Sequence, residues 1–405
     1  MAENAVDAER PAPAEPEASA SDRAAPARLI GVDLARGLAV FGMYAAHVGP
    51  DPSDGGATGF FMELSHGRSS ALFAFLAGFS VVLITGRHAP KTGRAGRQAV
   101  AKVVIRAVVL LALGTALTMT GTPVEVILAF YGLYFLLVLP LYRLGARPLA
   151  IIAASSALVL PQVLYVVQQA LPGGPDDGPD GIWAWPAGGD GIVSLLFTGS
   201  YPALSWLPFV IAGMAVARLD LASAVVRVRL AITGGALALL GHGGSFLALH
   251  LVPGAASAIH ASRGADGPAL SAWWSDTAGY PAGDTPAWLL AASPHSETTL
   301  SVLGNTGVAI AVLTACIAAT DAFPGLRRLA LPVIAVGTMS LSAYVLHIIG
   351  IGLLGIEDLP GSPPHVLLGF LAVVSVFATL WSRFFRRGPL EWLLGRATKA
   401  AELVR

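Results

Sequence analysis

The sequence predicts an all-α protein, a polytopic integral membrane helix bundle of about ten transmembrane helices. Of its 405 residues, 55% are hydrophobic and only 12% are charged, whereas a typical soluble domain carries about 25% charged residues. The mean hydropathy is +0.68, and apolar runs of about 20 residues, the length that crosses a bilayer, recur along the chain. This pattern leaves no room for a separate soluble domain of any size.

The polar ends of the chain lie outside the predicted bundle. Residues 1–27 are mainly Ala, Pro, Glu and Asp, and they carry almost no large apolar side chain. Such a segment cannot bury enough surface to fold, so we expect a disordered cytoplasmic tail. The transmembrane domain is predicted for residues 28–398, and a short cytoplasmic C-terminal tail for residues 399–405.

The predicted spans follow one another at regular intervals. They cover residues 29–49, 69–87, 99–119, 124–142, 148–169, 192–217, 229–251, 299–320, 330–354 and 364–384. In the sixth span, Gly199, Pro202 and Pro208 are expected to interrupt the helix, which a bundle tolerates where neighbouring helices satisfy the freed backbone groups.

Charged residues in the loops orient the bundle. Lys and Arg gather in alternate connections, for example in 87–102 and 383–399, whereas the other loops hold mainly Asp and Glu. The positive-inside rule then places both termini in the cytoplasm and the loop 252–298 outside. We therefore expect a multi-pass protein of the cell membrane, surrounded by membrane lipids.

The outer loop at residues 252–298 is long enough to form a lid. Its tryptophans, including Trp288, are expected to anchor the protein at the membrane interface. Its histidines, His260 and His295, are expected to be ordinary solvated residues.

The first span carries polar side chains on one face. Asp33, Arg36, Tyr44 and His47 lie at i, i+3, i+11 and i+14, which is one stripe of an α-helix. A charged group at membrane depth is costly, so this stripe is expected to face the bundle interior or a water-filled cavity. Asp33 and Arg36 are spaced for a mutual ion pair, and Arg36 is also placed to meet an anionic ligand; both interpretations stay open.

Histidines are the candidate catalytic bases, because neutral imidazole is the commonest general base at neutral pH. The ninth span repeats the design of the first, with Gly337, Tyr344 and His347 on one stripe. Two helices are therefore expected to present a histidine inward at similar depth. His47 is the first candidate, His347 the second, and His66 in the first outer loop the third. Tyr344, or Tyr44 on the first span, is a candidate hydrogen-bond donor to an oxyanion.

Several other kinds of site have no support in the sequence. Cys316 is the single cysteine, which leaves no internal disulfide and no Cys-based metal site. No His-Glu-x-x-His spacing is present, and we expect no metal. No Gly-x-Ser-x-Gly motif is present either, so a serine acyl-enzyme is not supported. Nucleic acid is not an expected partner.

Six short motifs together resemble those of a known family. They are RLIGVDLARGLAVFGMYAAHVGP (28–50), SHGRSSALFAFLAGFSVVL (65–83), ILAFYGLYFLLVLP (127–140), TGSYPALSWLPFVIAGMAVARLDL (198–221), SLSAYVLH (340–347) and RRGPLEWLLGRAT (386–398). In this order they resemble the DUF418/YeiB-type membrane proteins of the transmembrane acyltransferase superfamily, which are related to heparan-α-glucosaminide N-acetyltransferase. The resemblance covers all of the chain except its two tails.

The resemblance implies an integral-membrane acyltransferase. Such an enzyme moves an acyl group, expected to be acetyl, from cytosolic acyl-CoA to a hydroxyl or amine of an extracytoplasmic glycan, lipid or secreted metabolite. Acetyl-CoA or another acyl-CoA is then the donor, and Asp33, Arg36 and Arg68 are the expected donor-binding residues. The catalytic candidates are those given above. Whether the chain forms a homodimer stays open.

A multi-pass transporter or exporter of a small molecule is the alternative. In that case the inward stripes line a substrate path, and the interrupted sixth span forms part of a gate. Transporters commonly contain inverted repeats, but the Asp–Arg–His stripe of the first span has no counterpart five spans later. Dependence on acyl-CoA separates the two hypotheses.

Overall fold

The computed structural model describes residues 29–87, 89–170, 190–281, 284–357 and 359–404. These residues form helices and turns, and they contain no β-strand. The predicted disordered tail at 1–27 and most of the outer loop at 171–190 lie outside the described residues. The all-α class expected from the sequence is confirmed.

Six helical segments of the described chain are long and apolar enough to cross a membrane. They are α2–α3 (Gly56–Thr85), α4 (Gly93–Thr118), α6 (Ala146–Ala170), α10–α11 (Ala224–Leu251), α13 (Thr299–Ala322) and α17 (Pro364–Phe384). Two bent pairs raise the number to eight, namely Gly191–Thr198 with α9 (Ala203–Ala217) and α15 (Leu331–Thr338) with α16 (Ser340–Leu354). The protein is thus a multi-pass membrane helix bundle, whereas the count of ten spans and the orientation of the termini stay predictions.

The two remaining predicted spans are also helical. α1 (Ile30–Val48) fills the first of them and lies in the core. α5 (Leu128–Val138) continues as a 3-10 helix to Arg143, which makes an apolar segment shorter than the others. Neither belongs to the group of six, because α1 carries the polar stripe and α5 is short.

The two bent pairs differ in how well the sequence predicted them. In the sixth predicted span the helix bends by 65° before Ala203, at the expected Gly and Pro, while Pro208 lies inside α9. In the ninth, Gly337, Tyr344 and His347 were expected to share one stripe of a single helix, and this is wrong, because α15 and α16 meet at Met339 with a bend of 90°. Gly337 and His347 therefore lie on two different helices.

The break at Met339 is stabilised from a distant helix. The backbone N–H groups of Leu341 and Ser342 both donate to the carboxylate of Glu391, at 2.8 and 3.1 Å. Glu391 belongs to α18 (Pro389–Ala397), near the C-terminus. An acidic side chain at a helix N-terminus satisfies free N–H groups and interacts favourably with the helix dipole.

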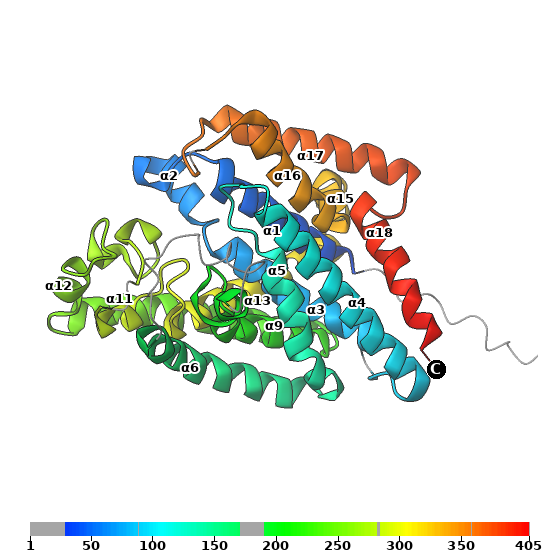
Figure 1. Cartoon of the computed structure of the whole chain (residues 1–405), viewed down its shortest axis with the longest axis horizontal. Helices are drawn as coiled ribbons and strands as arrows, with labels where there is room; N and C mark the ends of the chain where they lie inside the picture. Colours follow the sequence, from blue (N-terminus) through cyan, green and yellow to red (C-terminus); the bar gives the residue numbers. More distant parts are fainter. Residues whose placement is uncertain (1–28, 88, 171–189, 282–283, 358, 405) are drawn as a thin grey trace, which may run out of the picture.

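The bundle has a buried centre and a peripheral layer. In α2–α3 and α13, 72% and 61% of the apolar window is buried, against 17–28% in α4, α6, α10–α11 and α17. Figure 1 shows α6 and α17 on opposite sides of the molecule. Their exposed side chains are largely apolar, for example Val166 and Val373, as expected for helices that face lipid.

Close backbone contacts hold the central helices together. A Cβ atom on Gly78 of α3 would lie 1.8 Å from the Val210 carbonyl of α9, and one on Gly337 of α15 would lie 1.8 Å from the Asp33 carbonyl of α1. Only glycine permits such approaches, and small residues are the usual contact residues between membrane helices.

The long loop at residues 252–298 folds over one end of the bundle. It contains α12 (Ala255–His260) and the 3-10 helices Ala269–Ser271, Asp276–Ala278 and Pro286–Leu290. Its small apolar cluster includes Ile259 and Trp288. Trp288 is 1% exposed and its indole donates to Ser262, so the expectation of an interfacial anchor at this position is wrong. We call residues 252–298 the cover loop.

The loop charges predict opposite sides of the membrane for Arg94 and the cover loop. Arg94 and Ala261 are both exposed. In a Cys316→Ala background, we expect a cysteine at position 261, and not one at position 94, to react with an impermeant thiol reagent on intact cells. If the cysteine at position 94 reacts and the one at position 261 does not, the predicted orientation of the bundle is reversed. Permeabilised cells, in which both cysteines should react, provide the control.

Candidate active site

His47 of α1 and His347 of α16 form a direct pair. The Nδ1 atom of His47 lies 2.9 Å from the Nε2 atom of His347, and the two rings stack with 5.1 Å between their centroids. His347 is 1% exposed, whereas His47 is only half-buried and also interacts electrostatically with His66 and His295. The sequence-based expectation that two helices present a histidine at the same depth agrees with this arrangement.

Hydrogen bonding assigns the protons of this pair. His347 Nδ1 bonds to the backbone carbonyl of Tyr344, so Nδ1 must carry the hydrogen and Nε2 must be the acceptor. His47 Nδ1 therefore donates to His347, and in the neutral pair His47 Nε2 keeps its lone pair. His47 thus presents an unprotonated ring nitrogen that is oriented by the partner behind it.

Two tyrosines pack around the pair without facing the accessible side. The Tyr44 ring stacks on His347, and its hydroxyl donates to the Ala343 carbonyl at 2.7 Å. Tyr344 is 1% exposed, and its hydroxyl accepts the Ile127 N–H at 3.2 Å. Both tyrosines thereby hold α16 in place behind the histidines.

A second histidine is paired with a carboxylate. His66, in the turn before α3 (Arg68–Thr85), has its Nδ1 atom 2.8 Å from Oδ2 of Asp276 in the cover loop. Burial alone would raise the pKa of Asp276, but the hydrogen bond and the charge of His66 hold that pKa below its usual value. The other ring nitrogen, His66 Nε2, is buried and has no hydrogen-bond partner in the described part of the chain.

The residues around this dyad hold the cover loop to the bundle. Glu63 accepts the backbone N–H of Asp276 at 3.1 Å. Arg68 donates to the Glu63 carbonyl at 2.8 Å and to the Trp274 carbonyl at 2.6 Å. Arg68 therefore joins the start of α3 to the cover loop, and its position is set by these two carbonyl groups.

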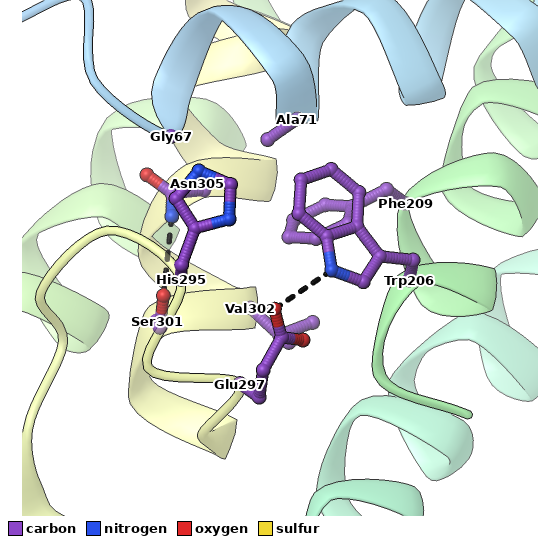
Figure 2. Close-up of a pocket in the computed structure, with 9 residues that line it drawn as sticks. All are labelled: Gly67, Ala71, Trp206, Phe209, His295, Glu297, Ser301, Val302 and Asn305. Atoms are coloured by element: carbon purple, nitrogen blue, oxygen red, sulfur yellow. Dashed lines mark hydrogen bonds between the residues drawn. The ribbon is translucent and has the colours of Figure 1, made fainter. Parts of the chain in front are cut away.

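A small pocket opens beside the dyad. Figure 2 shows Trp206 and Phe209 of α9 on one side and His295 and Glu297 of the cover loop on the other. The remaining lining residues are Gly67, Ala71, Ser301, Val302 and Asn305. The side-chain oxygen of Asn305 is buried without a hydrogen-bond partner among the described residues. An unsatisfied acceptor in a pocket is suited to a ligand that carries an N–H or O–H group.

Backbone conformations beside the pocket are unusual. His295 and Glu297 have φ angles of 54° and 58°, in the left-handed region that non-glycine residues seldom occupy. Gly67 has φ 60°, and a Cβ atom there would lie 2.8 Å from the Cβ atom of Pro294, so glycine allows the His66 turn to approach the cover loop. Strained residues of this kind cluster at functional sites.

Glu297 is the acidic group of the pocket. Its carboxylate accepts the indole N–H of Trp206 at 2.8 Å and bonds to the hydroxyl of Ser205. Burial raises the pKa of Glu297 to about 7, although both hydrogen bonds act in the opposite direction. Near neutral pH this side chain therefore exists in both its neutral and its charged form.

The predicted donor-binding residues lie in two separate places. Arg36 bonds to Asp33 at 3.1 Å and to Ser80 of α3 at 2.9 Å, so the mutual ion pair is present. Arg36 and His47 are eleven residues apart on α1, which is about 16 Å along a helix. Arg68 lies with the dyad, so the structure does not bring it together with Arg36.

Sequence reasoning missed two residues of the site and misjudged a third. Asp276 and Glu297 were not singled out, because loop positions have no periodicity that reveals their neighbours. His295 was expected to be solvated, and this is wrong, because its ring packs against Tyr201 and Trp206. Among the described residues, no group of three or more His, Cys, Asp or Glu side chains is arranged to hold a metal ion.

Two family models match this sequence. The model of the heparan-alpha-glucosaminide N-acetyltransferase catalytic domain matches residues 28–250, which is more than half of the chain. The model of DUF418, a family of proteins of unknown function, matches residues 270–401. No curated protein matches the sequence. His66 lies in the first matched region and Asp276 in the second, so the dyad joins the two.

The raised pKa of Glu297 predicts a pH-dependent stability. An acid whose folded-state pKa lies above its unfolded value of 4.5 contributes stability that is complete below about pH 4.5 and is lost as the pH rises through about 7. We expect the detergent-purified protein to lose about 1–2 kcal/mol of stability between pH 5 and 8 from this group. In Glu297→Gln this loss should disappear from the melting curves, while the exposed control Glu402→Gln should keep it. An unchanged pH dependence in Glu297→Gln would show that Glu297 is charged throughout.

Proposed function

The chain belongs to the heparan-alpha-glucosaminide N-acetyltransferase catalytic family, and from this we propose that it is a membrane acyltransferase that uses acetyl-CoA or another acyl-CoA as its donor. The acceptor is an amine or hydroxyl of an extracytoplasmic glycan, lipid or secreted metabolite. We place the protein in the cell membrane with both termini in the cytoplasm, as the loop charges predict.

The His66–Asp276 dyad is the observation that carries the proposal. A carboxylate bonded to Nδ1 fixes the tautomer of an imidazole and stabilises its protonated form, which is the arrangement that activates a histidine base in acyl transfer. Of the candidate histidines, His66 alone has a described carboxylate partner within hydrogen-bond distance. Its unpartnered Nε2 is the atom that would accept the proton of the acceptor.

The reaction then needs one bond to form and one to break. The acceptor loses a proton to His66 Nε2, its nitrogen or oxygen attacks the thioester carbonyl, and a bond from that atom to the acyl carbon forms. The bond between the acyl carbon and the CoA sulfur then breaks, and CoA leaves as a thiolate. The proton held by His66 passes to the thiolate, which restores the neutral imidazole.

The His47–His347 pair supports an amine as the acceptor. A hydroxyl group loses one proton on acylation, whereas an ammonium group loses two, one before attack and one as the amide forms. His47 Nε2 and His66 Nε2 both keep lone pairs in the neutral state, and their rings interact electrostatically. Two bases at one site suit a substrate that gives up two protons.

An exporter is the second candidate, and the two bent helix pairs favour it, since discontinuous helices line the substrate sites of many transporters. The exporter hypothesis gives no role to the His66–Asp276 dyad. Purified protein that releases CoA from acetyl-CoA only when an acceptor is present supports the acyltransferase, and protein that does not react with acyl-CoA at all supports the exporter.

Loss of the dyad should remove most of the activity. We expect His66→Ala to lower the acyl-transfer rate by about 100- to 10,000-fold, the usual contribution of a positioned base. Asp276→Asn should also lower it, because an amide at that position does not select the same tautomer. The control is His260→Ala, an exposed histidine of the same cover loop. If His66→Ala releases CoA at the full rate, the dyad has no part in the reaction.

The His47–His347 pair should distinguish the two kinds of acceptor. If His47 takes the second proton of an ammonium group, His47→Ala should lower transfer to an amino sugar at least 10-fold more than transfer to its hydroxyl analogue. Donor affinity should be unchanged, because the imidazole acts on the acceptor. Equal losses with both acceptors would contradict the role as a second base, and loss of acyl-CoA binding would point to a donor contact instead.

A further inference from the structure

The outer face of α18 combines apolar and basic side chains. Trp392 and Leu393 are both more than half exposed. Arg396 and Lys399 are also exposed, about one and two helical turns after Trp392. The guanidinium of Arg396 lies 5.1 Å from the centre of the Trp392 ring, so the cation and the aromatic ring form one surface. The opposite face of α18 includes Leu394, which is buried.

This surface directly follows a helix that faces lipid. Only 17% of the apolar window of α17 is buried, and four residues separate the end of α17 at Phe384 from the start of α18 at Pro389. Phe384 and Phe385 are exposed, and the indole of Trp381 fixes the connection by donating to the Arg387 carbonyl at 2.9 Å. Figure 1 shows α18 following α17 at the edge of the molecule. The helix α18 therefore begins where α17 leaves the apolar interior of the membrane.

The exposed charges around α18 are mainly positive. In residues 383–403 they are one carboxylate, Glu402, and five cations, namely Arg383, Arg386, Arg387, Arg396 and Lys399. The second carboxylate, Glu391, is half-buried and accepts the N–H groups of Leu341 and Ser342. The loop charges predict that this side of the bundle is cytoplasmic, and anionic lipids give the cytoplasmic leaflet a negative surface potential. The charge of α18 is therefore complementary to that of the leaflet beside it.

The helix α18 also holds the start of the helix that carries His347. Besides the two contacts of the Glu391 carboxylate, the backbone N–H of Leu390 donates to the hydroxyl of Ser342 at 3.0 Å. A Cβ atom on Gly388 would lie 2.5 Å from the Cβ atom of Met339, so the turn before α18 packs directly on the break between α15 and α16. From that break α16 continues to His347. The position of α18 therefore bears on the position of α16.

We propose that the outer face of α18, formed by Trp392, Leu393, Arg396 and Lys399, binds the anionic phospholipid headgroups of the membrane that the protein spans, and that this binding holds the first turn of α16 in place. Trp392 and Leu393 enter the boundary between headgroups and acyl chains, while Arg396 and Lys399 contact the phosphates. Burial of apolar surface and attraction between opposite charges then act together. The inference does not rest on the reaction proposed above, because neither an acyl donor nor an acceptor takes part in it.

Fluorescence quenching in nanodiscs tests the binding. In a Cys316→Ala background, Leu393→Cys is labelled with an environment-sensitive fluorophore, and the full-length protein is placed in nanodiscs that contain brominated phosphatidylglycerol or the same fraction of brominated phosphatidylcholine. We expect phosphatidylglycerol to quench about twice as strongly, because it is drawn to the cations of α18. Val373→Cys, labelled in the same way on the lipid-facing side of α17, should be quenched equally by both lipids.

Two double variants show whether the cations of α18 cause this preference. Arg396→Gln/Lys399→Gln should remove it, whereas the matched control Arg327→Gln/Arg328→Gln, at two exposed arginines of another connection, should keep it. Equal quenching by the two lipids at position 393 of the otherwise unchanged α18 would overturn the proposal. So would a disulfide between two copies of the unlabelled Leu393→Cys variant, which would show that a second chain covers this face.

Amide hydrogen exchange tests the effect on α16. The N–H groups of Leu341 and Ser342 lie in the first turn of the helix, where no preceding turn protects them, and Glu391 accepts from both. We expect them to exchange about 10-fold more slowly in phosphatidylglycerol nanodiscs than in phosphatidylcholine nanodiscs, and Arg396→Gln/Lys399→Gln should remove the difference. Equal exchange in the two lipids would overturn the link between α18 and α16.

The lipid-binding face and the proposed reaction can fail separately. Lipid-dependent quenching and exchange in a protein that transfers no acyl group would leave the lipid-binding face standing and remove the proposed function. Acyl transfer by a protein whose quenching and exchange are the same in both lipids would do the reverse.

Discussion

Placing a charged or strongly polar side chain inside an apolar bundle costs several kcal/mol unless a partner, water or a ligand satisfies it. In this protein the central helices are packed so that each of these polar side chains has a partner. Arg36 bonds to both Asp33 and Ser80, which ties α1 to α3. One hydrogen bond joins the imidazoles of His47 and His347, which ties α1 to α16. Close backbone contact at Gly337 then places α15 directly on α1. The polar face of α1 therefore determines which helices surround it.

The sequence was most informative where side chains repeat with a helical period. Apolar runs of bilayer length predicted the helices, and the spacing of Asp33, Arg36 and His47 predicted a stripe that faces inward. The same reasoning placed His347 at the depth of His47. Periodicity succeeds here because each helix buries one face, and the buried face can be read from the chain itself.

The sequence was least informative where partners are distant and irregular. His66 and Asp276 are 210 residues apart, and they lie in a turn and at the start of a three-residue 3-10 helix, neither of which has a readable period. The bend at Met339 depends on a carboxylate about 50 residues later, so the local residues of the ninth span give no sign of it. Such contacts are set by tertiary packing, which overrides local preference.

For the acyl transfer proposed above, one consequence concerns the wasteful hydrolysis of the thioester donor. The histidine of the dyad belongs to the bundle, whereas its carboxylate belongs to the segment that covers the site. Because Asp276 belongs to the cover loop, a displacement of the loop that takes this residue with it would separate the carboxylate from His66. An imidazole that has lost its carboxylate is a weaker and less well oriented base. The protein would therefore be least able to activate water at the moment when water is most abundant, and the energy of the acyl donor would be conserved for the intended acceptor.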